Sequence, residues 1–271
     1  VTLRIRDQGS CNAVIVRPEH LDRAKDLLAR FPQMEGRELV SRVRLGTSQH
    51  VNPGGHPRIA LVDCGAKSSI VSELVKRGAE VLLVSSADGA EAILGSDPDA
   101  VLFSNGPGDP AVLPTEVRLA SELRGKTTLL GICLGHQLLG QALGLTTFKM
   151  RFGHHGGNQP VRDEQTGRVF VTSQNHGFAV DEGNLPAGAQ VWFRNANDKS
   201  VEGISWQNER LWAVQFHPEA GPGPHDARWI FDRFVEIAGR RGEASESRTR
   251  GYETDRGTGA AEAGASAWST D

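Results

Sequence analysis

The sequence predicts an α/β fold with a largely parallel central sheet and helices on both faces of that sheet. Short apolar segments of strand length alternate with longer segments in which apolar residues recur at helical spacing, which is the pattern of a parallel sheet. Glycine-rich turns follow two of the apolar segments. These turns fall at carboxyl ends of strands, where open α/β sheets hold their ligands.

The amino-terminal part, residues 1–45, precedes this alternation. Residues 11–16 are strand-like, and residues 19–31 have apolar residues at helical spacing. Residues 46–57 contain several glycines and prolines and are predicted to be a linker. We therefore expect the α/β domain to span residues 58–238.

The predicted elements of this domain follow in order. Its first half contains four short apolar strands, at residues 58–62, 80–84, 100–103 and 127–132. Helical spacing is found at residues 68–77, 116–124 and 134–143. From residue 148 onward the pattern changes to strands and hairpins, at residues 169–172, 190–193, 201–205 and 211–214.

The carboxyl-terminal part begins with a predicted helix at residues 227–237. Residues 239–271 are rich in Gly, Ala, Ser, Thr, Glu and Arg and have no apolar period. Such a composition buries too little apolar surface to fold, so we expect a disordered tail.

The composition indicates a cytoplasmic protein. A net charge of −3 and a pI near 6.3 disfavour nucleic-acid and acidic-membrane partners, because neither polyanion would be attracted by the whole surface. The three cysteines have no paired spacing, so a reducing compartment is expected. The sequence has neither an apolar run near the ~20 residues of a membrane span nor the core of a signal peptide.

Cys133 lies between two glycines, Gly131 and Gly135, where the strand at residues 127–132 leads into the helix at residues 134–143. The glycines permit the tight backbone of a nucleophile elbow. At this position the sulfur faces the amino-terminal end of the helix, whose N–H groups and dipole stabilise a thiolate. Cys133 is therefore the predicted nucleophile.

A second motif supplies a base and a group to orient it. His217 and Glu219 follow the predicted strand at residues 211–214 and are separated by Pro218. The proline favours an extended conformation at His217, which lets the two side chains converge. We predict His217 as general base and then acid, and Glu219 as the group that orients the imidazole.

Together these motifs resemble the signatures of class I glutamine amidotransferases, which use Cys-His-Glu residues. The signatures are GICLGHQ at residues 131–137 and QFHPE at residues 215–219. The chain resembles carbamoyl-phosphate synthase small subunits more closely than anthranilate or GMP synthase relatives. That narrower resemblance rests on segments 63–67, 104–110, 152–158, 174–181 and 219–226, and the whole match covers residues 1–238.

The resemblance implies a glutamine site at seven further residues, Gly106, Gly108, Leu134, Gln137, Asn175, Gly177 and Phe178. The glycine loop and the N–H of Leu134 would meet the oxyanion. Composition alone favours an ordinary turn for the loop, and the alternative for Gln137 is a solvated helix position. We predict no metal site, because no carboxylate or cysteine at ligand spacing accompanies His154, His155 and His176.

The implied function is that of a glutaminase subunit that delivers ammonia to a large synthetase subunit for carbamoyl phosphate, and so for arginine and pyrimidine synthesis. The implied partners are L-glutamine and the large subunit in a heterodimer, and ATP would be used there, so this chain needs no cofactor. The amino-terminal domain usual in that subunit has no counterpart here, and residues 1–45 resemble the region that follows it. Two alternatives are an inactive or regulatory relative and the glutaminase of another amidotransferase.

Overall fold

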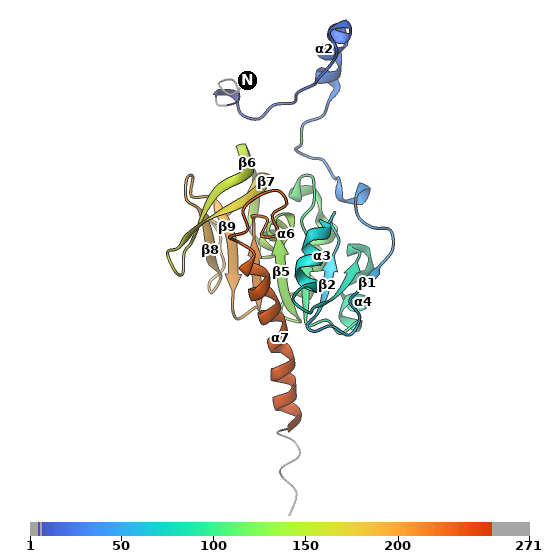
Figure 1. The fold of residues 1–271 in the computed structure, drawn as a ribbon, viewed down its shortest axis with the longest axis vertical. Coiled ribbons are helices and arrows are strands. Elements are labelled where there is room, and N and C mark those ends of the chain that lie inside the picture. The colour runs from blue at the N-terminus through green and yellow to red at the C-terminus, as the bar shows by residue number, and fades with distance from the viewer. Residues whose placement is uncertain (1–4, 6, 251–271) are drawn as a thin grey trace, which may run out of the picture.

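The computed structural model describes residue 5 and residues 7–250, and these contain one ten-stranded mixed sheet (Figure 1). The strand order is β1-β3-β2-β4-β5-β10-β9-β8-β6-β7. The strands are β1 (Gln49–Val51), β2 (Arg58–Val62), β3 (Glu80–Val84), β4 (Ala100–Phe103), β5 (Thr128–Ile132), β6 (Thr146–Asp163), β7 (Val169–Asp181), β8 (Gln190–Asn195), β9 (Val201–Trp206) and β10 (Leu211–Val214).

The central strands β3, β2, β4, β5 and β10 are parallel. Four helices follow strands of this half, namely α3 (Ser68–Val75), α4 (Gly89–Gly95), α5 (Pro114–Leu123) and α6 (Leu134–Ala142). The strands of this half are apolar along their length because both sheet faces are covered. The predicted fold class is confirmed here. The helix α4 was not predicted.

Two apolar clusters hold the helices on opposite faces of the sheet. One contains residues of α4, α5 and α6, and the other contains residues of α3 and of α7 (Trp229–Arg250). In Figure 1, α7 crosses the front of the sheet beside α3 and extends beyond the body of the molecule. The expected helix at residues 227–237 is therefore longer than predicted.

The antiparallel half carries the strands predicted after residue 148, and most of them are longer than predicted. β6 and β7 form a hairpin with register shifts between Lys149 and His154 and between Gly156 and Gln159. β8 and β9 connect this hairpin to β10. Because β10 pairs with β5 in parallel and with β9 in antiparallel orientation, it joins the two halves of the sheet.

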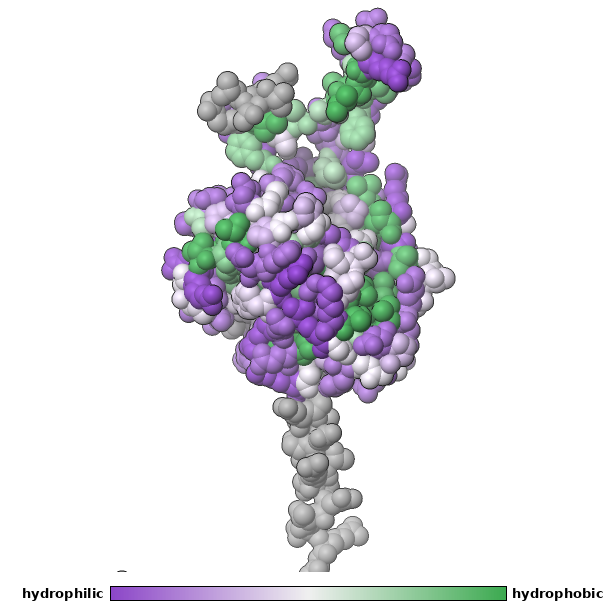
Figure 2. Space-filling view, viewed as in Figure 1, coloured by the Kyte–Doolittle hydropathy of each residue, from purple (hydrophilic) through white to green (hydrophobic). Residues whose placement is uncertain are grey.

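The amino-terminal arm differs from the prediction in one element. The helix α2 (Leu21–Arg30) forms as expected. Residues 11–16 are not a strand, because no strand in the described part of the chain pairs with them. Figures 1 and 2 show α2 away from the body, and its side chains Leu21, Leu27 and Leu28 are exposed.

Two further predictions are corrected. The expected linker, residues 46–57, contains the edge strand β1, whose short polar sequence gave no strand signal. Residues 239–250, expected to begin a disordered tail, continue α7, because Ala, Glu and Arg favour a helix even without an apolar face. The remainder of that tail lies outside the described residues. None of the helices within residues 5 and 7–250 has the length and apolar character of a membrane span.

Candidate active site

Cys133 occupies a sharp turn between β5 and α6. Its φ of 55° and ψ of −103° are strained for a residue with a side chain. Its N–H donates to the carbonyl of Val214 in β10 at 2.8 Å. Gly135 permits this turn, since a Cβ there would lie 2.0 Å from the carbonyl oxygen of Phe103. The predicted elbow is therefore present.

His217 lies just beyond the carboxyl end of β10, next to the elbow. Its Nδ1 is 2.7 Å from Oε1 of Glu219, and its backbone N–H donates to Ser173 in β7 at 2.8 Å. Burial opposes a charge on the imidazole, but the charge and hydrogen bond of Cys133, with those of Glu219, outweigh it and raise the pKa of His217 to about 10. This environment favours the imidazolium form of His217.

Glu219 is buried, and its Oε1 contacts both His217 and Lys67. Burial opposes its charge, yet the hydrogen bond and charge of His217 and the charge of Lys67 lower its pKa. The Nζ of Lys67 lies 3.0 Å from Oε1 of Glu219 and donates to the Ala220 carbonyl at 2.5 Å. Lys67 was not predicted as a site residue, although its segment, residues 63–67, carried part of the family resemblance.

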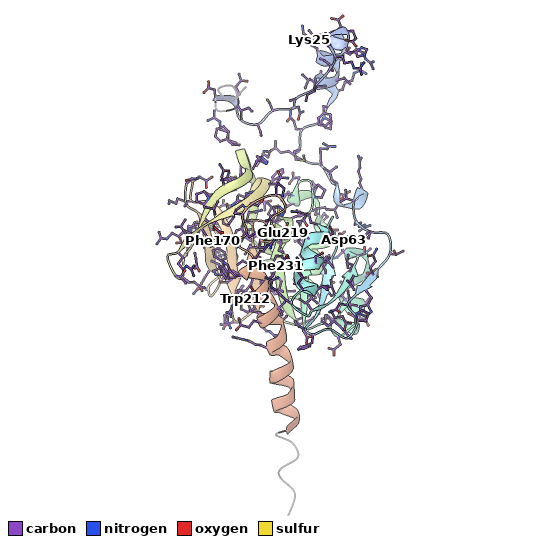
Figure 3. The ribbon with its side chains drawn as sticks, in the orientation of Figure 1. Lys25, Asp63, Phe170, Trp212, Glu219 and Phe231 are labelled. Carbon is purple, nitrogen blue, oxygen red and sulfur yellow. The ribbon has the colours of Figure 1, made fainter. Side chains whose placement is uncertain are left out.

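A cavity of about 1200 Å³ opens beside the elbow. Eight of the predicted site residues line it, namely Gly106, Gly108, Cys133, Gln137, Asn175, Gly177, Phe178 and His217. Glu219 lies behind His217, and Leu134 is buried as the first residue of α6. Figure 3 places Glu219 and Asp63 toward the upper ends of the central strands, which are their carboxyl ends.

The glycine loop is shaped by close packing as well as by the cavity. A Cβ at Gly106 would lie 2.2 Å from the Cys64 carbonyl oxygen, so only glycine fits there. Gly108 has a φ of 102° and lies against the backbone of Arg37 in the amino-terminal arm. Asn105 fixes the loop by accepting a bond from the N–H of Lys67 at 3.0 Å.

Gln137 connects the elbow helix to β7. Its Nε2 donates to the Phe178 carbonyl at 2.8 Å and to Oε1 of Gln215 at 3.0 Å. The side chain is buried, which excludes the alternative of a solvated helix position. Phe178 also packs beneath the Nζ of Lys149, 5.5 Å from its ring centroid.

The premise behind the prediction of no metal site is corrected by the structure. Two carboxylates do accompany the histidines: Oε1 of Glu202 lies 3.1 Å from His154 Nδ1, and Oδ2 of Asp198 lies 2.9 Å from His154 Nε2. They are remote in sequence from His154 and His176, so ligand spacing could not reveal them. His155 instead contacts the Asn175 side chain at 2.9 Å.

Comparisons with known proteins agree with this geometry. A family model described as glutamine amidotransferase class-I matches residues 60–237. The carbamoyl phosphate synthase small chain of Archaeoglobus fulgidus is 45% identical over 239 residues, which cover 88% of this chain and 66% of that protein. The small chain of Methanopyrus kandleri is 45% identical over 243 residues, with 88% and 67% covered. This chain thus spans about two thirds of the length of these relatives.

Two further comparisons extend the picture. The chloroplastic small chain of Arabidopsis thaliana is 47% identical over 188 residues, which cover 69% of this chain and 44% of that protein. Among solved structures, a candidate GMP synthase component from Thermoplasma acidophilum is similar with a TM-score of 0.59 at 21% identity, covering 70% of this chain and 97% of that one. That structural likeness concerns the fold alone.

Proposed function

Because the chain belongs to the class-I glutamine amidotransferases, and within them to the carbamoyl phosphate synthase small chains, we propose that it hydrolyses L-glutamine to glutamate and ammonia. One observation carries this proposal. Cys133 and His217 line the same cavity, and Glu219 contacts the far side of the imidazole at 2.7 Å.

In the proposed reaction the Cys133 thiolate attacks the side-chain amide carbon of glutamine. The tetrahedral oxyanion is stabilised by N–H groups, including that of Leu134, which has no intrahelical acceptor because Leu134 is the first residue of α6. The His217 imidazolium gives its proton to the departing nitrogen, and a γ-glutamyl thioester and ammonia result. Water that loses a proton to His217 then cleaves the thioester. This step releases glutamate, whose new carboxyl group loses its proton to solvent, and restores the Cys133 thiolate and the His217 imidazolium.

Four of the remaining predicted residues have proposed roles in binding the amino-acid end of glutamine. Asn175, Gly177 and Phe178 lie on one strand that lines the cavity, and Gln137 faces it from α6. Gly106 and Gly108 lie in the loop on the opposite side of the cavity, where a backbone without side chains can approach the oxyanion. Lys67 is added as a positioning residue, since it contacts Glu219 and not the reacting sulfur.

We further propose that the ammonia serves a large synthetase subunit that forms carbamoyl phosphate from bicarbonate and two ATP. The relatives named carbamoyl phosphate synthase small chain support this partner. The same assignment places the protein in arginine and pyrimidine synthesis. The three free cysteines are compatible with the proposed cytoplasmic location, where thiols stay reduced.

The direct test is glutamate release from glutamine by the native chain and by Cys133→Ala, each with and without a carbamoyl phosphate synthase large subunit. We expect release by the native chain and a loss of at least about 10³-fold in the variant, which retains the fold but not the nucleophile. Release that is unaffected by the substitution would overturn the mechanism. No release by the native chain under either condition would favour the inactive or regulatory alternative.

A second measurement identifies the partner reaction. Bicarbonate and ATP are added to the same mixture, and carbamoyl phosphate is quantified with glutamine or with ammonium as nitrogen source. Formation from glutamine that requires Cys133 supports the proposed partner. Formation from ammonium only, while glutamate is still released, would indicate a glutaminase of another amidotransferase.

A further inference from the structure

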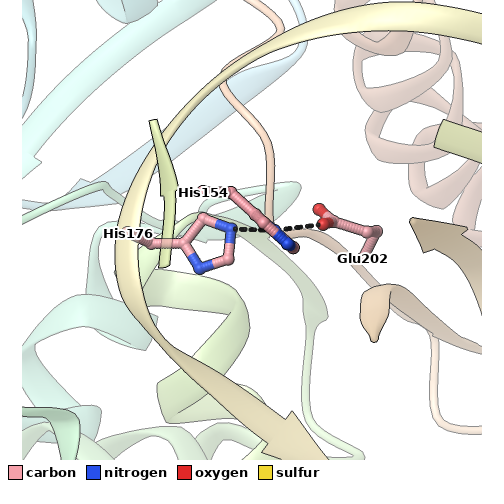
Figure 4. A group of neighbouring side chains, drawn as sticks. All are labelled: His154, His176 and Glu202. Atoms are coloured by element: carbon pink, nitrogen blue, oxygen red, sulfur yellow. Dashed lines mark hydrogen bonds and ion pairs between the residues drawn. The ribbon is translucent and has the colours of Figure 1, made fainter. Parts of the chain in front are cut away.

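A buried cluster of three side chains lies at the cavity wall formed by β7, and one of the three, His176, is among the residues that line the cavity (Figure 4). His154 comes from β6, His176 from β7 and Glu202 from β9. Glu202 has no exposed surface, and its Oε2 has no hydrogen-bond partner within the described residues. The cluster plays no part in the proposed reaction at Cys133.

The outer ring nitrogens of the two histidines both face groups that only accept hydrogen bonds. His154 Nε2 is 2.9 Å from the Asp198 carboxylate, and His176 Nδ1 is 2.9 Å from the carbonyl oxygen of Phe178. Both outer nitrogens therefore carry hydrogen. A neutral imidazole has only one N–H. If both rings were neutral, each inner nitrogen, His154 Nδ1 and His176 Nε2, would carry a lone pair and no hydrogen.

Those inner nitrogens face each other. His154 Nδ1 lies 3.2 Å from His176 Nε2 and 3.1 Å from Oε1 of Glu202. Three acceptors at such distances repel one another unless a cation lies among them. The assigned amide orientation puts Oε1 of Gln174, another acceptor, 2.9 Å from His176 Nε2. A lone pair on Nε2 requires this amide to be turned, so that its nitrogen donates to Nε2 and its oxygen faces the Thr172 hydroxyl.

We propose that this cation is a proton shared by His154 and His176 and balanced by Glu202, and that the three side chains are positioning residues for the glutamine-binding wall. One proton on His154 Nδ1 accounts for both distances, 3.2 Å to His176 Nε2 and 3.1 Å to Glu202 Oε1, which lie within the hydrogen-bond range. Burial opposes a charge on His154, yet the hydrogen bonds and charges of Glu202 and Asp198 outweigh it and raise the pKa of His154. Burial and the neighbouring His154 lower the pKa of His176 to about 3, so the proton belongs formally to His154.

The Phe178 carbonyl connects the buried cluster to residues that line the cavity. It accepts bonds from His176 Nδ1 at 2.9 Å and from Gln137 Nε2 at 2.8 Å, and so joins β7 to the elbow helix α6. Without the shared proton, His176 would move its N–H to the inner nitrogen and lose the bond to Phe178. Burial raises the pKa of Glu202, so this carboxylate keeps its charge only while His154 keeps the proton.

The kinetic test rests on the proposed function and uses Glu202→Gln, which keeps the shape and removes the charge. We expect KM for glutamine to rise about tenfold, the effect of one lost hydrogen bond, with kcat within about twofold. Glu164→Gln is the matched control, because Glu164 is exposed and makes only long pairs of 3.7 and 3.9 Å with Arg162 and Arg194. His154→Gln should not add to the effect of Glu202→Gln if the pair acts as a unit. An unchanged KM, or multiplied effects in the double variant, would overturn the positioning role.

A second test needs no activity and uses the native chain. Nitrogen-15 spectra of the imidazole side chains at pH 7 should show His154 with both nitrogens protonated and His176 with hydrogen on Nδ1, and Glu202→Gln should return His154 to a neutral ring. Two neutral rings in the native chain would overturn the proposal. A divalent metal found at one equivalent by elemental analysis, and lost in His154→Gln, would also overturn it. If the spectra show the expected protonation of His154 and His176 but the native chain releases no glutamate, the shared proton stands and only the proposed function is overturned.

Discussion

Cys133 and Cys64 are both almost fully buried, yet their surroundings give the two thiols opposite character. Cys133 faces the cavity and His217, whereas Cys64 has no exposed surface. Burial, together with the charges of Glu116 and Asp63, raises the pKa of the Cys64 thiol far above its usual range. Burial alone therefore does not decide whether a cysteine is reactive.

Alkylation should separate the three cysteines. With iodoacetamide at pH 7, we expect Cys133 to react about tenfold faster than exposed Cys11, because a thiolate is the attacking species, and Cys64 to react only after unfolding. Peptide mass spectrometry over time measures all three sites in one sample, with Cys11 as the internal reference. A Cys133 rate equal to or below that of Cys11 would contradict the thiolate–imidazolium pair.

The lowered pKa of Glu219 predicts how acid affects stability. A carboxyl group whose folded pKa lies below its unfolded value of about 4.3 stabilises the fold above that value, and this stability is lost as pH falls through the folded pKa. We expect Glu219→Gln to cost about 1–3 kcal/mol at pH 7 and less at pH 3. Urea unfolding of both proteins at several pH values measures the difference, and a difference independent of pH would argue against an ionised Glu219.

At the scale of elements, the elbow depends on how closely α6 approaches β4. Gly135 brings the first turn of α6 against the Phe103 carbonyl, and Gly131 in β5 lies against the backbone of Gly135. These contacts fix the direction of α6 and hence the position of Cys133 above the sheet. Gly131 and Gly135 therefore permit the close packing of α6 on β4 and β5, in addition to the turn at Cys133.

Gly135→Ala should therefore destabilise the protein by about 1–3 kcal/mol or more, since its Cβ would lie 2.0 Å from a carbonyl oxygen. Gly95→Ala is the control, because a Cβ at the end of α4 meets open space. That substitution should change the free energy of unfolding by less than about 1 kcal/mol. Chemical denaturation compares the two variants, and equal effects would contradict the close approach.

The apolar strands β2, β3, β4 and β10 were predictable with their bounds because both of their faces are buried and turns delimit them. β1 was not, since an edge strand of three residues with two exposed side chains leaves no apolar signal. The opposite error occurred at residues 11–16, where an apolar stretch has no strand to pair with. The local pattern of apolar residues therefore predicts which strands are buried, but it does not predict which segments find a partner strand.

At the scale of the whole molecule, the cavity lies where the two halves of the sheet meet. Cys133 and the glycine loop come from the parallel half, whereas Asn175 and Phe178 come from the β6–β7 hairpin. The sequence motifs predicted eight of the residues that line this cavity. They could not predict the contact of Lys67 with Glu219 or of His154 with Glu202, because both join segments remote in sequence and depend on the tertiary fold.

A ligand that touches both halves should stabilise the whole fold. A glutamine analogue with an electrophilic side chain, attached covalently to Cys133, is expected to raise Tm, by about 2–4 °C for each kcal/mol of contact with the cavity wall. Calorimetry of the native chain and of Cys133→Ala measures this. A shift of the same size in the variant, which cannot form the bond, would show that the compound acts elsewhere.

The position of β10 has a last consequence. The N–H of Cys133 donates to Val214 of β10, and β10 leads directly to His217, so sheet pairing itself sets the spacing of sulfur and imidazole. The β6–β7 hairpin supplies the wall opposite without carrying either group. Sheet pairing thus sets the spacing of the proposed pair, and β7 adds one backbone bond to it, from the His217 N–H to the Ser173 carbonyl. Substitutions of other hairpin side chains can therefore reshape the cavity wall without moving the sulfur or the imidazole.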